Sequence, residues 1–440
     1  EKVNDEMDKV SRTYEIFKDV QLHQAEDMAA FKKAKSELYQ RLNTLNDLLN
    51  HKMYGAVDSA KGYNAWYQSH QPFHWLAEFY EIINEHGGFD VIIGNPPYVE
   101  YNKKVKGVAV SDLYKLVGYK TLSCGNLYAY VLERSKNIMR QEGYISMIVP
   151  LSGHSTERMA PLVTNFYEKF RLHLHLNLSA DAHPQKLFEG VKFRLVIFTA
   201  TNNGVGKYST KYTRWLADER KNLFNALVRY NSIEDYTYQN IIPKIASPLF
   251  ISIARKIKEE KVQYFVGIGN EQCLYHNAPV NWIRSHTFVP YFCSDRDGEG
   301  ITTQLKSVSF DNTKQVKVGS CILNSSLFFI WWITNSDCYH LNKPEIVNFR
   351  YQYDKGIEKE ICSVADRLAI DMKKKCIRRI YNYKTTGRVE YDEFYMKLSK
   401  PIIDEIDKLL ARHYDFTEEE LDFIINYDIK YRMGDELNEE

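Results

Sequence analysis

The sequence predicts an α/β protein with a helical arm before it and a mixed α+β region after it. Two short apolar runs that end in turn residues predict buried strands at residues 90–94 and 144–150. Between them, residues 127–139 have the spacing of a helix, which Gly143 is expected to end. Strands that alternate with helices indicate a sheet covered by helices.

The segment before these strands differs from them in composition. Residues 1–50 contain no Gly or Pro and are rich in charge. Leucines recur there at helical spacing, which predicts an amphipathic helix that packs on another element. They are Leu38, Leu42, Leu45 and Leu49. We therefore expect a helical arm, or insertion, over residues 1–70.

After residue 150 a helix is expected at about 156–170, followed by strands at 172–178 and 195–198. The turn-rich run 202–206 predicts the end of a first domain that covers residues 71–205.

The C-terminal half is mixed and rich in aromatic residues. It has an apolar stretch at 327–332 and a long amphipathic segment at about 355–380. Residues 206–400 therefore form a predicted second domain. A helical, acidic tail follows over 401–440, in which Thr417 and Glu420 have the spacing of a capping box.

Composition sets broad limits on the class of protein. The 58 Lys and Arg almost balance the 57 Asp and Glu, so net charge does not decide whether the partner is a polyanion. The seven cysteines form no C-x-x-C pair, which favours free thiols in a reducing cytosol, and hence a cytoplasmic location. No apolar run reaches the roughly 18 residues that span a bilayer. The chain starts without Met, in a charged helical pattern, and we expect it to continue a longer polypeptide.

The tetrapeptide Asn95-Pro96-Pro97-Tyr98 directly follows the first predicted strand. Each X-Pro step favours extended backbone before the proline, and the prolines leave carbonyls without matching N–H donors. The result is a stiff loop at the carboxyl end of a strand, where α/β sheets bind ligands. It presents an amide oxygen, a proline carbonyl and an aromatic face.

These groups suit one reaction. An aromatic amine is a poor nucleophile because its lone pair is delocalised into the ring. Two acceptors, Asn95 Oδ1 and the Pro96 carbonyl, can draw its hydrogens and release that lone pair toward a methyl donor. Tyr98 can hold the base by stacking, a contact that contributes about 1–3 kcal/mol.

With this motif the sequence resembles the N6-adenine-specific DNA methyltransferases of restriction–modification systems, in the gamma motif order, and in particular the large type II and IIG-like members. The resemblance covers most of the chain and thins between about 210 and 390. It is carried by residues 73–79 and 87–98, by 126–134 and 143–150, and by 399–404 and 420–428.

The resemblance implies a fold and a set of roles. Residues 71–205 would be the C-terminal half of a Rossmann-like class I methyltransferase sheet, and 206–400 a target-recognition domain for double-stranded DNA. A second aromatic residue would cover the other face of a flipped adenine. Phe188 is the expected one, with His183 and Phe193 as fallbacks; a packing role for Phe188 is equally open.

One departure from the family affects activity. The family binds S-adenosylmethionine through a Gly-rich strand-to-helix turn and an acidic ribose ligand before the catalytic loop, and residues 1–90 contain neither. We expect the donor site in a missing N-terminal part of the same polypeptide, and the chain alone to be inactive. A nuclease motif is not evident here, so a fused or separate endonuclease would lie elsewhere.

Two basic stretches are candidate DNA contacts. The first follows the catalytic loop and contains Lys103 and Lys104. The second has no acidic residue and interleaves tyrosines, although such a run is also typical of a solvated helix end. It comprises Lys373, Lys374, Lys375, Arg378, Arg379, Lys384 and Arg388.

His173 and His175 lie on one side of a predicted strand. We interpret them as facing a polar surface opposite the leucines, because no carboxylate or Cys at ligand spacing completes a metal site, and we expect no metal.

Two other functions stay open. A protein-glutamine or RNA methyltransferase could use the same tetrapeptide, but more than two hundred residues follow it here, which favours DNA recognition. A DNA-binding specificity module with an idle loop would explain the missing donor site.

Overall fold

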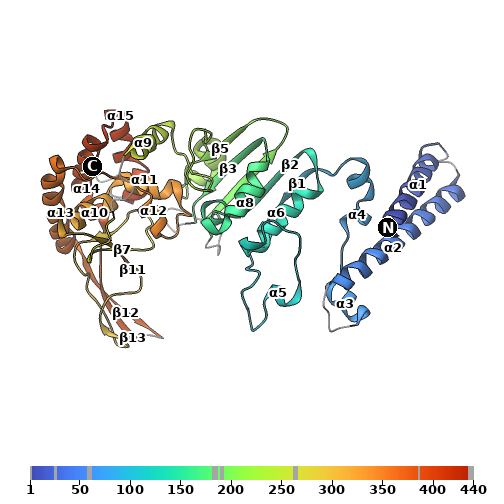
Figure 1. Ribbon diagram of the computed structural model, residues 1–440, viewed down its shortest axis with the longest axis horizontal. Coiled ribbons are helices and arrows are strands. Elements are labelled where there is room, and N and C mark those ends of the chain that lie inside the picture. The colour runs from blue at the N-terminus through green and yellow to red at the C-terminus, as the bar shows by residue number, and fades with distance from the viewer. Residues whose placement is uncertain are drawn as a thin grey trace. The chain divides into compact units, whose positions relative to one another are not determined.

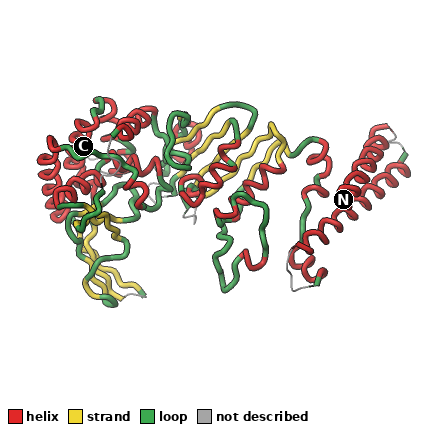
Figure 2. Tube along the Cα trace, viewed as in Figure 1, coloured by secondary structure: helices red, strands yellow, loops and turns green. Residues whose placement is uncertain are grey.

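The computed structural model describes residues 2–23, 27–56, 62–180, 187–188, 193–260, 266–384 and 387–434. They form a mixed α/β structure with several sheets (Figures 1 and 2), which confirms the α/β class. The chain divides into two compact units. The first comprises Glu1–Ile93, Glu100–Tyr119 and Tyr130–Ile145, and the second Gly94–Val99, Lys120–Ala129 and Ser146–Glu440.

The first unit begins with two long helices, α1 (Lys2–His23) and α2 (Met28–Ala56), that pack along each other (Figure 1). Leu38 and Leu45 of α2 are buried with Val10 of α1, and Leu42 and Leu49 pack at the margin. The predicted amphipathic helix is confirmed. The unit also holds α3 (Tyr63–His70), α4 (Trp75–Glu78), α5 (Val110–Leu113), most of α6 (Leu127–Ile138) and nearly all of β1 (Phe89–Gly94).

Gly88 lets β1 start close to the end of α6. A Cβ atom at this position would lie 2.6 Å from the Ile138 carbonyl oxygen and 2.6 Å from the Arg140 nitrogen, and the φ angle is +123°. Only glycine tolerates both the contact and the backbone angle. Asp90 and Arg140 then form an ion pair at 3.0 Å.

The largest sheet has six strands in the order β1-β2-β4-β3-β5-β6. β4 runs antiparallel to β3, β5 is parallel to β3, and β6 is antiparallel to β5. The predicted strands at 172–178 and 195–198 are confirmed. The bounds are β2 (Met139–Pro150), β3 (Leu172–Leu178), β4 (Leu195–Thr201), β5 (Gly206–Thr210) and β6 (Tyr230–Ser232).

Two predicted boundaries differ. β2 starts at Met139, so Gly143 lies inside a strand and does not end the helix, which stops at Ile138. The helix expected at 156–170 is replaced by the short α8 (Ala160–Asn165) between two 3-10 turns, and the separate helix α7 (Ser152–Ser155) precedes it. Thr156 is extended (φ −127°, ψ 147°), and Pro161 lies in the first turn of α8, where a missing N–H is tolerated.

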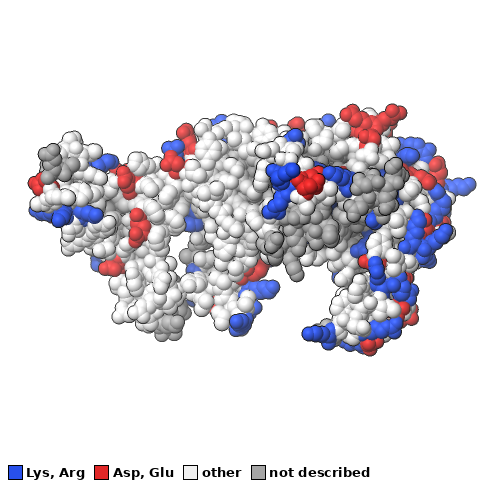
Figure 3. Space-filling model, turned by 180° about the vertical axis from the view of Figure 1, so that it is seen from behind, with Lys and Arg blue, Asp and Glu red and all other residues white. Residues whose placement is uncertain are grey.

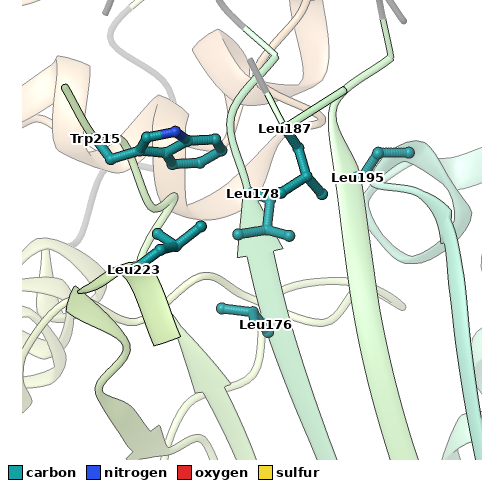
Figure 4. Close-up of a cluster of buried hydrophobic side chains, with 6 residues drawn as sticks. All are labelled: Leu176, Leu178, Leu187, Leu195, Trp215 and Leu223. Carbon is teal, nitrogen blue, oxygen red and sulfur yellow. The ribbon is translucent and has the colours of Figure 1, made fainter. Parts of the chain in front are cut away.

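A hydrophobic cluster sits between β3, β4 and the segment after β5 (Figure 4). Its six buried side chains are Leu176, Leu178, Leu187, Leu195, Trp215 and Leu223. Tyr98 and Ile148 pack against it. The sheet therefore continues past the turn at 202–206, where the sequence placed the end of the catalytic subdomain; the functional division into subdomains stays a prediction.

The rest of the second unit carries two smaller sheets and a helical core. The sheets have the orders β10-β9-β13-β12 and β11-β7-β8. Their strands are β7 (Glu271–His276), β8 (Ser285–His286), β9 (Phe292–Ser294), β10 (Gly298–Glu299), β11 (Leu305–Phe310), β12 (Ile377–Tyr383) and β13 (Gly387–Glu393). The helices are α9 (Pro248–Glu259), α10 (Thr313–Asn324), α11 (Ser326–Asn335), α12 (Lys343–Val347), α13 (Lys355–Lys375), α14 (Lys400–Tyr414), α15 (Glu418–Asn426) and α16 (Ile429–Met433).

The apolar stretch at 327–332 forms α11, all of whose residues are buried. In the described part of the chain no single helix is long and apolar enough to cross a membrane; α10 and α11 meet the criteria only as a pair, bent by 64°. The capping box of Thr417 and Glu420 is present at the start of α15.

Candidate functional site

The Asn95-Pro96-Pro97-Tyr98 loop leaves β1 at its carboxyl end, without helical or strand geometry, as the prolines predict. Pro96 is buried, Tyr98 is partly buried, and Asn95 and Pro97 are exposed. The loop ends where Leu127 N–H, at the start of α6, donates a hydrogen bond to the Val99 carbonyl at 2.9 Å. The loop is thus held at its far end and presents the Asn95 amide to solvent.

The Tyr98 hydroxyl fixes the middle of the loop. Its oxygen lies 2.7 Å from Asn95 Oδ1 and 2.8 Å from the Ile148 carbonyl oxygen on β2. The single phenol proton is divided between the two acceptors, so neither hydrogen bond has its full strength. Burial raises the pKa of Tyr98 to about 12, and the hydroxyl therefore stays a donor at neutral pH. Asn95 Oδ1 keeps a second lone pair for a ligand.

Aromatic rings surround Tyr98. Its ring meets Tyr128 edge-on at 6.2 Å and Phe193 at 5.8 Å, with interplanar angles of 89° and 78°. Leu151 N–H donates to the Arg194 carbonyl at 2.8 Å, which holds the residue next to Phe193 against the end of β2. The second unit therefore brings Asn95, Tyr98 and Phe193 together.

The predicted second stacking residue is less defined. Phe188 is 46% exposed beside the buried Leu187, and its role stays a prediction. The fallback Phe193 is 52% exposed and is the ring from this region that contacts Tyr98 among the described residues. His183, the other fallback, lies outside the described residues.

The interpretation of His173 and His175 as surface residues is wrong. Both are fully buried, and His154 of α7 and the ring of Tyr167 pack against His175 on that face of β3. His173 Nδ1 lies 3.0 Å from His175 Nε2, and His175 Nδ1 lies 3.2 Å from His154 Nδ1. Each ring thus hydrogen-bonds to its neighbour.

Burial lowers the pKa of all three histidines, that of His173 to about 4, so they are neutral at pH 7. No group of three or more metal-ligating side chains occurs among the described residues.

The first basic stretch is a turn on the protein surface. Lys103 and Lys104 are exposed, next to Val105, which closes a turn with Val108 through two backbone hydrogen bonds. The buried Tyr101 supports this segment by a 2.7 Å hydrogen bond to the Tyr114 carbonyl. Both lysines are available to a polyanion.

The second basic stretch forms the end of α13 and the hairpin β12–β13, which the sequence did not predict. Antiparallel pairing places Arg378 opposite Asp392 and Arg379 next to acids of β13. Arg378 binds Asp392 at 2.6 Å, Arg379 binds Glu393 at 2.8 Å, and Arg388 binds Glu390 at 3.0 Å. Figure 3 shows this alternation of basic and acidic side chains over the C-terminal part. The arginines of the run are therefore largely neutralised.

Among the lysines of this stretch, Lys375 pairs with Asp371 at 2.9 Å and Lys373 lies over the Phe288 ring at 4.3 Å. Lys374 and Lys384 are exposed and have no ion pair with described residues. Of the predicted DNA contacts, these two and Lys103 and Lys104 have neither an ion pair nor a ring contact with described residues.

Part of the chain is similar in sequence to known proteins. Residues 7–188 match the family model described as Eco57I restriction-modification methylase. A segment of 112 residues is 31% identical to the putative type II restriction enzyme and methyltransferase RM.MjaORFECS2P of Methanocaldococcus jannaschii, and covers 25% of this chain and 9% of that protein. The resemblance to restriction–modification methyltransferases is thereby confirmed. The matched segment spans less than a tenth of its relative.

Two solved DNA complexes align with parts of this chain at low sequence identity. The type IIL restriction-modification enzyme MmeI in complex with DNA aligns with a TM-score of 0.36 and 11% identity, over 78% of this chain and 57% of that one. The DrdV–DNA complex aligns with a TM-score of 0.28 and 12% identity, over 47% and 23%.

The buried histidines predict a dependence of stability on pH. Their folded pKa values lie below the 6.5 of a free histidine, so the unfolded chain binds more protons in mild acid. The stabilisation is complete above about pH 6.5 and is lost as the pH falls toward 4. Each histidine should remove about 1.4 kcal/mol of unfolding free energy per pH unit in that window, measured by urea denaturation.

His173→Asn should flatten this slope, whereas His51→Asn, an exposed position on α2, should not. An unchanged slope in His173→Asn would contradict the assignment.

Proposed function

We propose, on the premise that residues 7–188 carry the sequence of a restriction–modification methyltransferase, that this chain holds the adenine-binding half of a DNA methyltransferase active site. The observation that carries the proposal is the Tyr98 hydroxyl, which bonds both Asn95 Oδ1 and the Ile148 carbonyl, while its ring contacts that of Phe193. The target would be the N6 amine of adenine, flipped out of double-stranded DNA at a cost of a few kcal/mol.

The residues of this chain would bind and orient the adenine amine. Asn95 Oδ1 and the Pro96 carbonyl accept the two amine hydrogens, which draws the nitrogen toward tetrahedral geometry and frees its lone pair. Tyr98 holds the Asn95 amide in place through its hydroxyl and stacks on the base through its ring. Phe193 or Phe188 supports the base from the neighbouring segment. No strong general base is required, because the proton leaves after methyl transfer.

DNA would be held by residues outside this pocket. The unpaired side chains of Lys103, Lys104, Lys374 and Lys384 suit phosphate contacts, each of which adds to the salt dependence of binding. Residues 206–400 would supply target recognition.

The methyl donor does not fit the described residues before β1. These residues are helical, and no strand followed by a Gly-rich turn occurs among them to hold S-adenosylmethionine. β1 is an edge strand of the six-stranded sheet, and its Val91 and Ile93 are 62% and 80% exposed. Large apolar side chains on an edge strand favour further polypeptide packed there. We assign the donor site to that polypeptide.

A specificity module with an idle catalytic loop is the second candidate, and the unsuitable donor region favours it. The two candidates differ in whether a donor-binding partner restores methylation.

Asn95→Ala in the polypeptide that contains the donor site should abolish methylation and leave DNA affinity within about twofold, because an exposed amide acceptor is removed and no packing is lost. Methyl incorporation followed by nucleoside mass spectrometry would measure the rate and identify N6-methyladenine. Asn203→Ala, at an exposed turn, is the matched control. Undiminished methylation by Asn95→Ala would refute the mechanism.

Tyr98→Phe keeps the ring and removes the hydroxyl that orients Asn95. A lost hydrogen bond is worth about 0.5–1.5 kcal/mol, so kcat/KM should fall about two- to tenfold. Tyr98→Ala should lose roughly 1–3 kcal/mol more through stacking. Steady-state kinetics would be compared with Tyr144→Phe, an exposed tyrosine of β2. Equal effects of the Phe and Ala variants would argue against stacking by Tyr98.

Calorimetric titration of the 440-residue chain with S-adenosylmethionine should give no binding isotherm, because its described residues offer no donor site. Mixing with the donor-binding polypeptide should restore both binding and methylation. Tight binding by the chain alone would overturn the assignment of the donor site to another part.

A further inference from the structure

A cleft of about 810 Å³ lies in the C-terminal part of the second unit, away from the Tyr98 loop in sequence and made by other strands. Its lining residues come from β7 and β8, from β9 and β13, and from the segment that leads into β11. Both small sheets therefore contribute to the cleft.

Arg284 lines this cleft and has no hydrogen bond or ion pair from its guanidinium to the described residues. Burial lowers the pKa of Arg284, and the field of Glu393 only partly opposes this. A desolvated cation without a partner is costly. The feature indicates that a ligand supplies the missing acceptors.

The acids of the cleft are directed to other partners and form no hydrogen bond or ion pair with Arg284 among the described residues. Asp297 binds Arg296 at 2.8 Å and Asp392 binds Arg378 at 2.6 Å. Glu393 accepts from Arg379 at 2.8 Å and from the Tyr395 hydroxyl. Arg284 is left as the uncompensated charge among the cleft's described side chains.

A neutral donor accompanies the cation. His276 Nδ1 accepts from Ala278 N–H at 3.3 Å, so its Nε2 donates to Gln304 Oε1 at 2.8 Å. Burial lowers the pKa of His276 to about 4, which keeps the ring neutral. This bond orients the Gln304 amide and leaves its nitrogen hydrogens without a partner among the described residues. The cleft thus offers donors to an acceptor-rich ligand.

Flat aromatic side chains complete the lining. Tyr291 and Phe292 stand on one side, and Tyr391 and Phe394 belong to the β13 segment. Such apolar surface lowers the local dielectric, which strengthens a hydrogen bond between Arg284 and a ligand.

We propose that this cleft receives the major-groove edge of a guanine in target DNA, with Arg284 donating to O6 and N7. The inference rests on the proposed function, since it requires DNA as the partner. Those two acceptors match the fork of a guanidinium and distinguish guanine from the other bases. The two neighbouring acceptors of a guanine edge use the planar fork of a guanidinium, whereas a backbone phosphate is served equally well by an exposed lysine.

The test selects binders of the 440-residue chain from duplex DNA with a randomised central segment, at fixed salt. The wild-type chain should enrich a motif with an invariant guanine. Arg284→Gln should lower the preference for guanine at one position by about tenfold or more and leave the other positions unchanged. Arg284→Lys should lose the same preference, because it keeps the charge without the fork. Arg412→Gln, an exposed and ion-paired arginine of α14 outside the cleft, should retain the motif.

The outcomes separate the two claims. An unchanged motif in both Arg284 variants, with circular dichroism confirming their fold, overturns the guanine contact and leaves the proposed function intact. A uniform loss of affinity with a shallower salt dependence, rescued by Arg284→Lys, identifies a phosphate contact and also overturns it. Absence of DNA binding by the wild-type chain refutes DNA as its partner, and with it the proposed function.

Discussion

Tyr98 connects three parts of the molecule that are far apart in sequence: its own loop, the end of β2 and the core around Leu178. It joins the Asn95 amide to the Ile148 carbonyl at the end of β2, while the Tyr98 ring packs on the cluster around Leu178 and Trp215. The amide is therefore oriented by the same core that stabilises the sheet. An exposed side chain can adopt several rotamers, and the partly buried Tyr98 phenol, which rests on a packed core, holds the Asn95 amide in one orientation.

Local sequence signals predicted the elements that depend on local physics. The proline pair specified an extended loop, the leucine spacing specified α2, and Thr417 with Glu420 specified the start of α15. The prediction failed where tertiary packing decides. On β3 the alternation suggested one apolar and one polar face, but Leu172 and Leu174 are only partly buried while the histidines are fully buried. Neutral imidazoles that hydrogen-bond to each other can replace water, and a single strand's pattern does not report this.

The same limit applies to charge. The run from Lys373 to Arg388 contains no acid, yet its arginines meet Glu390, Asp392 and Glu393 because β12 and β13 pair antiparallel. The acids follow immediately after the run, so a hairpin centred before Gly387 would have predicted the pairing. The sequence singled out one candidate catalytic loop, whose role stays a prediction. It could not rank the basic residues, because their value to DNA depends on which carboxylates lie opposite.

The same dependence makes Arg284, which lies outside the basic run, a stronger candidate ligand contact than the ion-paired arginines of the run. A guanidinium bound to a carboxylate has engaged part of its donors and has its charge compensated, so a further anion gains less from it. Among the described residues Arg284 has no such partner; it lines a cleft and is desolvated by its surroundings. The free-energy cost of this unpaired cation is offset only when a ligand supplies acceptors, so its contribution to binding would depend strongly on the ligand. Under the proposed guanine contact, a base without those acceptors would leave the cation unpaired, and the difference in free energy would select the base.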